Sequence, residues 1–98
     1  MPLNAKQRKH LRKLGHNLHP VVYIAGQGLK ETVIEATEEA LAAHELIKVK
    51  IRADDRQDRD QLVRSLYHTT HSDLVSQTGG VALLYRKHPE HPKIELPR

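Results

Sequence analysis

Hydrophobic residues follow two spacings along this chain, and together these spacings predict three helices and four strands. Apolar positions three or four residues apart predict helices, and short alternating or continuous apolar runs predict strands. The expected helices span residues 4–15, 29–44 and 57–71, and the expected strands span 21–24, 46–53, 74–78 and 81–86. Strands joined through a helix should be parallel, and a Gly79-Gly80 turn should make the last pair antiparallel. The chain is therefore expected to be an α/β domain of the two-layer α+β type, in the order α-β-α-β-α-β-β, with a four-stranded mixed sheet.

The sequence also indicates which side of each predicted helix should face the core and which should face solvent. In the first helix, Asn4 is a candidate N-cap, Gly15 is a candidate terminator, and Leu11, Leu14 and Leu18 share one stripe. The second helix should have its inner face at Leu29, Val33, Ala36, Thr37, Ala40, Leu41 and His44, with Ile34 on the flank. Its outer face should hold Glu31, Glu35, Glu38, Glu39 and Glu45.

The strand at 46–53 alternates between an apolar face and a basic face. Lys48, Lys50 and Arg52 lie on the basic face. Such a face is either open to solvent or a partner, or belongs to an edge strand that uses lysine against aggregation.

Length and composition narrow the class of protein. The 98 residues suffice for one domain, spanning 1–98, with a proline-containing tail at 87–98 that should be extended or mobile. The chain has no cysteine and no apolar run of membrane-spanning length, so a cytoplasmic protein without disulfides is expected. Three tyrosines without phenylalanine or tryptophan argue against a platform on which nucleic-acid bases stack.

Charge is segregated along the chain, within a net charge of +4. Residues 1–20 contain lysine and arginine but no acid, whereas residues 31–45 contain glutamate but neither lysine nor arginine. A helix that only faces solvent normally mixes both signs. The first helix is therefore a candidate polyanion-binding surface, and a merely solvated face is the alternative.

A glycine loop joins the first strand to the second helix. It follows the run from Val21 to Ile24 and has the sequence Ala25-Gly26-Gln27-Gly28, with Lys30 just after it. Glycines at a helix N-terminus can present backbone N–H groups to an anion such as a phosphate. The loop lacks the Gly-Lys-Ser/Thr of a nucleotide-binding loop and the third glycine of a dinucleotide fingerprint. Spacing alone leaves open a tight turn with no ligand.

A metal site is the main enzymatic alternative. Asp54, Asp55, Asp58 and Asp60 lie in a polar segment that runs into the third helix, and His68 and His71 are three residues apart on that helix. The aspartates lack the glycine and glutamate of a calcium loop and are explained by helix capping, and no third ligand accompanies the histidines. We therefore expect no metal, no cofactor and no catalytic residue.

Several segments closely resemble the CRM domain, the chloroplast RNA splicing and ribosome maturation domain. They are residues 3–18, the connector His19-Pro20-Val21-Val22, the Gly-x-Gly-Leu turn, the run from His44 to Ile51, the final strand from Val81 to Arg86, and Ile94-Glu95-Leu96-Pro97. The resemblance covers essentially the whole chain and is closest to the small stand-alone bacterial members. It implies a fold similar to the C-terminal domain of bacterial translation initiation factor three. It also implies RNA binding and association with precursors of the large ribosomal subunit.

The family's GxxG loop, which is likened to the loop that clamps a nucleic-acid backbone in KH domains, maps onto residues 25–28. Ala25 replaces its first glycine and Gly28 is its second. The expected partner is thus ribosomal RNA, bound by a cytoplasmic monomer with no membrane or small-molecule ligand. A metal-dependent hydrolase and a protein-binding adaptor using the acidic helix are the alternatives. The candidate RNA-binding residues are Lys6, Arg8, Lys9, Arg12, Lys13, Ala25, Gly26, Gln27, Gly28, Lys30, Lys48, Lys50 and Arg52.

Overall fold

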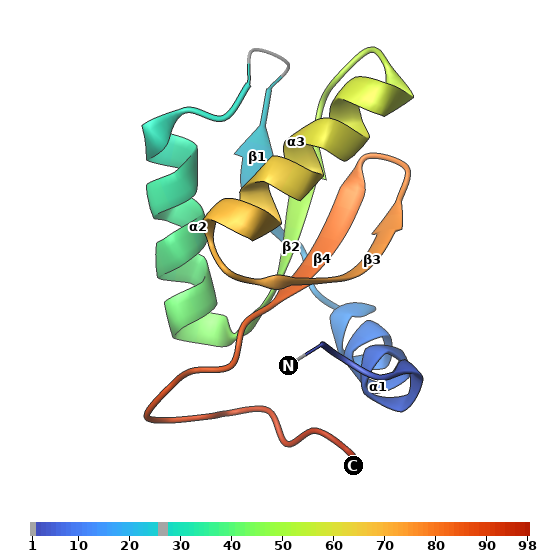
Figure 1. The fold of residues 1–98 in the computed structure, drawn as a ribbon, viewed down its shortest axis with the longest axis vertical. Helices are drawn as coiled ribbons and strands as arrows, with labels where there is room; N and C mark the ends of the chain where they lie inside the picture. The colour runs from blue at the N-terminus through green and yellow to red at the C-terminus, as the bar shows by residue number, and fades with distance from the viewer. Residues whose placement is uncertain (1, 26–27) are drawn as a thin grey trace.

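The computed structural model describes residues 2–25 and 28–98, and Figure 1 shows its three helices and four strands. The elements are α1 (Ala5–Gly15), β1 (Pro20–Ile24), α2 (Glu31–His44), β2 (Leu46–Ile51), α3 (Arg56–Thr69), β3 (Asp73–Thr78) and β4 (Val81–Tyr85). Every predicted element is present, with ends within two residues of those expected. No helix in the described residues is long and apolar enough to cross a membrane.

The four strands form one mixed sheet in the order β1-β2-β4-β3. β1 and β2 are parallel, and β4 lies antiparallel between β2 and β3. The predicted parallel and antiparallel pairings are thus confirmed. The edge-strand interpretation of β2 is wrong, because β2 has a neighbour on both sides. Its lysines therefore do not serve to protect a sheet edge.

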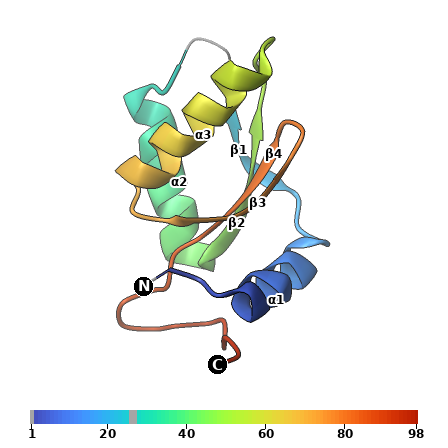
Figure 2. The same ribbon diagram turned by 45° about the vertical axis from the view of Figure 1, so that its right-hand side comes forward.

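Helices α2 and α3 cover one face of the sheet, which we call the closed face (Figure 2). Side chains that alternate along the strands meet residues from both helices there. The buried set is Val22, Ile24, Leu41, Ile47, Val49, Ile51, Val63, Leu66, Ala82 and Leu84. This cluster is the main hydrophobic core.

Helix α1 packs on the other face of the sheet, near one end, and we call this the open face (Figure 2). A second, smaller core forms beneath it from Leu11, Leu46, Val75, Leu83 and Tyr85. The predicted leucine stripe is only partly buried, because Leu14 and Leu18 remain 42% and 36% exposed. The helix lies across one end of the sheet, so no helix covers the rest of this face (Figure 2).

Gly15 has a different role from the terminator that the sequence suggested. It is the last residue of α1 and is buried, while His16 is the C-cap. A Cβ at Gly15 would lie 2.6 Å from Cδ2 of Leu83. The absent side chain therefore lets the end of α1 approach the sheet closely.

The inner face of α2 is narrower than expected. Ala36 and His44 are exposed, whereas Thr37 and Leu41 are buried. Thr37 satisfies its hydroxyl by donating to the carbonyl of Val33. The helix begins at Glu31 rather than Leu29.

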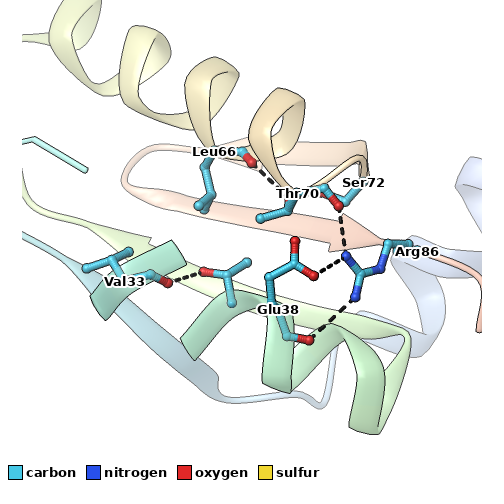
Figure 3. A network of polar contacts seen from close by, with 7 residues as sticks. Val33, Glu38, Leu66, Thr70, Ser72 and Arg86 are labelled. Carbon is cyan, nitrogen blue, oxygen red and sulfur yellow. Dashed lines mark hydrogen bonds and ion pairs between the residues drawn. The ribbon is translucent and has the colours of Figure 1, made fainter. Parts of the chain in front are cut away.

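Arg86, just after β4, joins the middle of α2 to the C-terminal end of α3 (Figure 3). Its Nη1 donates to Oε2 of Glu38 at 2.6 Å and to the backbone carbonyl of Thr70 at 2.9 Å. Glu38 is therefore not simply on the outer face of α2, as the pattern suggested. The guanidinium instead braces both helices of the closed face against the sheet.

Glu45 contradicts the predicted outer-face position most strongly, because it is fully buried. It follows α2 with a φ of 64°, in the left-handed region. Its carboxylate accepts hydrogen bonds from the backbone N–H groups of His88, Lys93 and Ile94, each at 2.7 Å. Burial raises the pKa of this carboxyl. The three N–H groups and the nearby His88 imidazole lower the pKa by a larger amount, so the net pKa lies below the ordinary value.

The C-terminal tail, residues 87–98, contains no helix or strand and is tied down by hydrogen bonds. Besides the bonds to Glu45, the carbonyl of Pro97 accepts from Nε2 of Gln7 in α1 at 3.1 Å. Ile94 and Leu96 pack against the small core of the open face. The tail thus adds to the cover that α1 provides at that end.

Candidate nucleic-acid interface

The exposed cations of α1 are held by a well-capped helix. The side chain of Asn4 accepts from the backbone N–H of Gln7 at 2.8 Å, and the side chain of Gln7 accepts from the backbone N–H of Asn4 at 3.1 Å. This capping box confirms Asn4 as the N-cap. The exposed cations on the helix are Lys6, Lys9, Arg12 and Lys13.

Arg8 differs from the other bases of α1. It is half-buried, and its Nη1 donates to the backbone carbonyl of Leu74 in β3. The side chain therefore ties α1 to the sheet. Only the remaining N–H groups of its guanidinium can reach a ligand.

Strand β2 carries the next cations along the open face. Its neighbours Val49 and Ile51 are buried in the closed-face core, so Lys48 and Lys50 point the other way. Lys48 is half-buried and lines a concave surface together with Arg12 of α1, while Lys50 is exposed. The structure thus brings the basic helix and the basic strand together at this point.

The far end of the sheet holds the remaining predicted residues. Arg52 is exposed, and its backbone N–H donates to the carbonyl of Ile24 at 2.8 Å, so it lies beside the end of β1. Ala25 and Lys30 are exposed as well, and Gly28 has a φ of +98° with open space around its Cβ position. Gly26 and Gln27 lie outside the described residues.

The first turn of α2 is left without a side-chain cap. Its N-cap is Lys30, whereas α1 and α3 are capped by Asn4 and Asp55. Among the helices in the described residues, α2 is the one whose N-cap side chain accepts no hydrogen bond from the first turn. First-turn N–H groups of a helix can bind an anion.

The predicted residues form a line rather than one cluster. In Figure 1, α1 lies at the bottom of the molecule, while the end of β1 and the start of α2 lie at the top. Five residues of β1 separate the two ends, a length of about 16 Å at the usual rise of a strand. Lys48 and Lys50 lie between them. The surface suits an extended polyanion better than a small ligand.

Tyr23 is the residue at this surface that sequence reasoning missed. It lies between the buried Val22 and Ile24 on β1, so it points to the open face, and it is 64% exposed. The low aromatic content argued against a platform for base stacking, but β1 does offer one exposed aromatic ring. The alternation along β1, in which Val22 and Ile24 face the main core, is the sequence signal that could have identified Tyr23.

Asp55 caps α3, as the capping explanation predicts, whereas Asp60 lies within α3 and contacts β3. Oδ1 of Asp55 accepts from the backbone N–H of Gln57 at 3.0 Å, and Asp60 accepts from the side chain of Gln77 at 2.8 Å. Within residues 2–25 and 28–98, no group of three His, Cys, Asp or Glu residues is placed to hold a metal ion. The hydrolase alternative gains no support from this arrangement.

Comparison with known proteins assigns the chain to a family. The model of the CRS1/YhbY (CRM) domain family matches residues 3–86. The chain belongs to the CRM domain family. This membership confirms the resemblance drawn from the sequence.

Relatives of this CRM domain carry names that refer to RNA. A "probable RNA-binding protein" of Pseudomonas aeruginosa is 44% identical over 93 residues, which cover 95% of this chain and 89% of the relative. An "RNA-binding protein" of Haemophilus influenzae is 41% identical, over 98% of this chain and 96% of the relative. These names describe binding proteins rather than enzymes.

A solved structure has the same fold. It is the solution structure of a hypothetical protein from Staphylococcus aureus, described as a candidate RNA-binding protein. It matches with a TM-score of 0.84 and 36% identity, covering 97% of this chain and 99% of the other. The expected α/β fold is thereby confirmed.

Proposed function

We propose that this CRM domain is a non-catalytic RNA-binding protein that binds ribosomal RNA in precursors of the large ribosomal subunit. The observation that carries the proposal is the line of exposed and half-buried cations along the open face. It begins at Lys9 and Arg12, continues through Lys48 and Lys50, and ends at Arg52. The exposed glutamates of α2 belong to the helix layer on the other side of the sheet. RNA is the polyanion that the names of the relatives suggest.

Binding would rest on backbone phosphates. Each lysine or arginine that reaches a phosphate releases condensed counterions, and this release supplies most of the affinity for a polyanion. The uncapped first turn of α2, together with Gly28, would hold one phosphate through backbone N–H groups. No described element presents side chains in the pattern that reads a major groove, so recognition would follow the shape of the RNA.

The ribosomal assignment is the finer part of the proposal. It follows from what the family resemblance implies for small stand-alone bacterial members. We also propose that the protein is a cytoplasmic monomer that needs no cofactor. Crosslinking the protein to RNA in cells and sequencing the attached fragments tests the ribosomal assignment directly: fragments should concentrate in large-subunit RNA. A distribution that merely follows RNA abundance would contradict it.

A salt series tests the phosphate contacts of α1. Replacing Lys9, Arg12 and Lys13 by Gln keeps helix propensity nearly constant and leaves the buried Leu11 in place. If all three contact phosphate, the slope of log affinity against log salt should flatten by about two to three units on a structured ribosomal RNA fragment. Folding stability should change little.

The matched control removes three exposed cations elsewhere. Arg56 and Arg64 of α3 and Lys87 of the tail are replaced by Gln, which changes the net charge equally. This control should keep the wild-type slope. Equal slopes for wild type and the α1 variant would show that α1 is only a solvated face.

A further inference from the structure

The uncovered part of the open face carries one row of side chains across the sheet. Tyr23 of β1 is paired in register with Lys50 of β2, Lys50 with Val81 of β4, and Val81 with Thr78 of β3. Partners in register point to the same face, about 5 Å apart on neighbouring strands. The tyrosine ring and the Lys50 ammonium therefore belong to one continuous surface.

Helix α1 ends just before this row. The preceding row contains Lys48 and Leu83, which are also paired, and the end of α1 at Gly15 packs directly on Leu83. Two residues along a strand is about 7 Å, so the bare row begins immediately beyond the helix. In it Tyr23, Lys50 and Thr78 are exposed and Val81 is half-buried.

Exposed apolar side chains also gather on this side of the described structure. The large ones are Leu14, Leu18, Val21 and Tyr23. The first three line a shallow groove that includes Lys48. An isolated exposed apolar residue is ordinary, but several beside a line of cations suit a ligand that is both apolar and anionic.

We propose that Tyr23 stacks on an unpaired nucleobase of bound RNA, while Lys50 and Lys48 neutralise the phosphates beside it. The proposal rests on the function proposed above and adds single-stranded RNA to the substrates of that surface. An unpaired nucleotide combines a flat apolar ring with an anionic backbone, which matches the side chains in this row. Base stacking on an aromatic side chain is tolerant of sequence, because every base has a π-face. The domain would thus favour RNA with an unpaired segment next to a helix.

The test uses two ligands of equal charge: an eight-nucleotide RNA of adenosine, and an eight-residue RNA backbone without bases. It compares wild type, Tyr23→Ala and Tyr23→Phe, where the phenylalanine variant keeps the ring. Because Tyr23 is exposed on an edge strand, both variants should retain the wild-type unfolding midpoint.

Wild type and Tyr23→Phe should bind the adenosine ligand about 5- to 100-fold more tightly than the abasic ligand. Tyr23→Ala should bind both ligands equally, at the abasic level. A base preference that survives in Tyr23→Ala, or one that disappears in Tyr23→Phe, would overturn the stacking proposal.

The two proposals fail in distinguishable ways. If only the stacking proposal is wrong, wild type still binds both ligands with a salt-dependent affinity, and Tyr23→Ala matches wild type on each. If neither oligonucleotide nor ribosomal RNA binds, both proposals fail. If Tyr23→Ala weakens association with subunit precursors but not with these ligands, Tyr23 contacts a protein, and stacking is again excluded.

Discussion

The closed face of the sheet is covered along its length by α2 and α3, whereas the open face is covered at one end only, by α1 and the tail (Figure 2). The same strands build both faces. On β2, Ile47 and Val49 are buried in the main core, while Lys48 and Lys50 point to the open face. Substitutions one residue apart on β2 should therefore separate folding stability from the RNA binding proposed for the open face.

The largest effect should come from the closed face. Leu84 of β4 is fully buried in the main core, and Leu84→Ala should lower the free energy of unfolding by about 2–5 kcal/mol. Lys50→Ala, on the neighbouring strand and the open face, should change it by about 0.5 kcal/mol or less. Urea unfolding of both variants measures the difference. Similar losses of stability in the two variants would mean that Lys50 on the open face also contributes to folding stability.

A smaller effect should come from the cover of the open face. Glu45→Gln keeps the size of the side chain but removes the charge that holds three backbone N–H groups, so stability at pH 7 should fall by about 1–3 kcal/mol. Glu39→Gln, at an exposed position on α2, is the matched control and should have little effect.

The pH dependence of this difference has a definite sign. Because the pKa of Glu45 is lower in the folded protein, its contribution is present above the ordinary value of 4.5 and is lost as the pH falls through the folded pKa. The gap between wild type and Glu45→Gln should therefore narrow below about pH 4.5. A gap that stays constant down to pH 2 would show that the charge of Glu45 is not what holds the tail.

The smallest effect should come from the loop end of the open face. Gly28→Asp and Gly28→Asn have the same shape and share the strain of a φ of +98°, so they differ mainly in charge. If a phosphate lies beside Gly28, the aspartate should weaken RNA binding about fivefold more than the asparagine, because two like charges 4 Å apart in water repel by about 1 kcal/mol. Equal affinities of the two folded variants would remove the loop from the interface.

The sequence predicted the helices and strands of this fold better than it predicted which of them lie next to one another. Periodicity and turn residues place each helix and strand, and the capping box of α1 is readable from Asn4 and Gln7. Periodicity does not say which strand lies beside which, so the central position of β2 was missed. Nor does it say how far α1 extends over the sheet, which decides whether Tyr23 is buried or exposed.

Charged residues were the least predictable part of the molecule. Glu45 and Arg86 look like surface residues in the sequence, because their partners lie between 16 and 49 residues away along the chain. A buried carboxylate is stable only when backbone N–H groups converge on it, and tertiary structure alone brings them there. The exposed lysines of α1 and β2 needed no such partners, so their placement followed directly from the local pattern.

The position of β4 has a consequence for how the chain folds. β4 is the last strand in the sequence, but it lies second from one edge of the sheet, between β2 and β3. Before residues 81–85 emerge from the ribosome, β2 can pair only with β1, and β3 has no partner in the native sheet. Both cores also remain incomplete, since Leu84 belongs to one and Leu83 to the other. Folding during synthesis must therefore wait for the final strand, and the native sheet then forms through contacts that are distant in sequence.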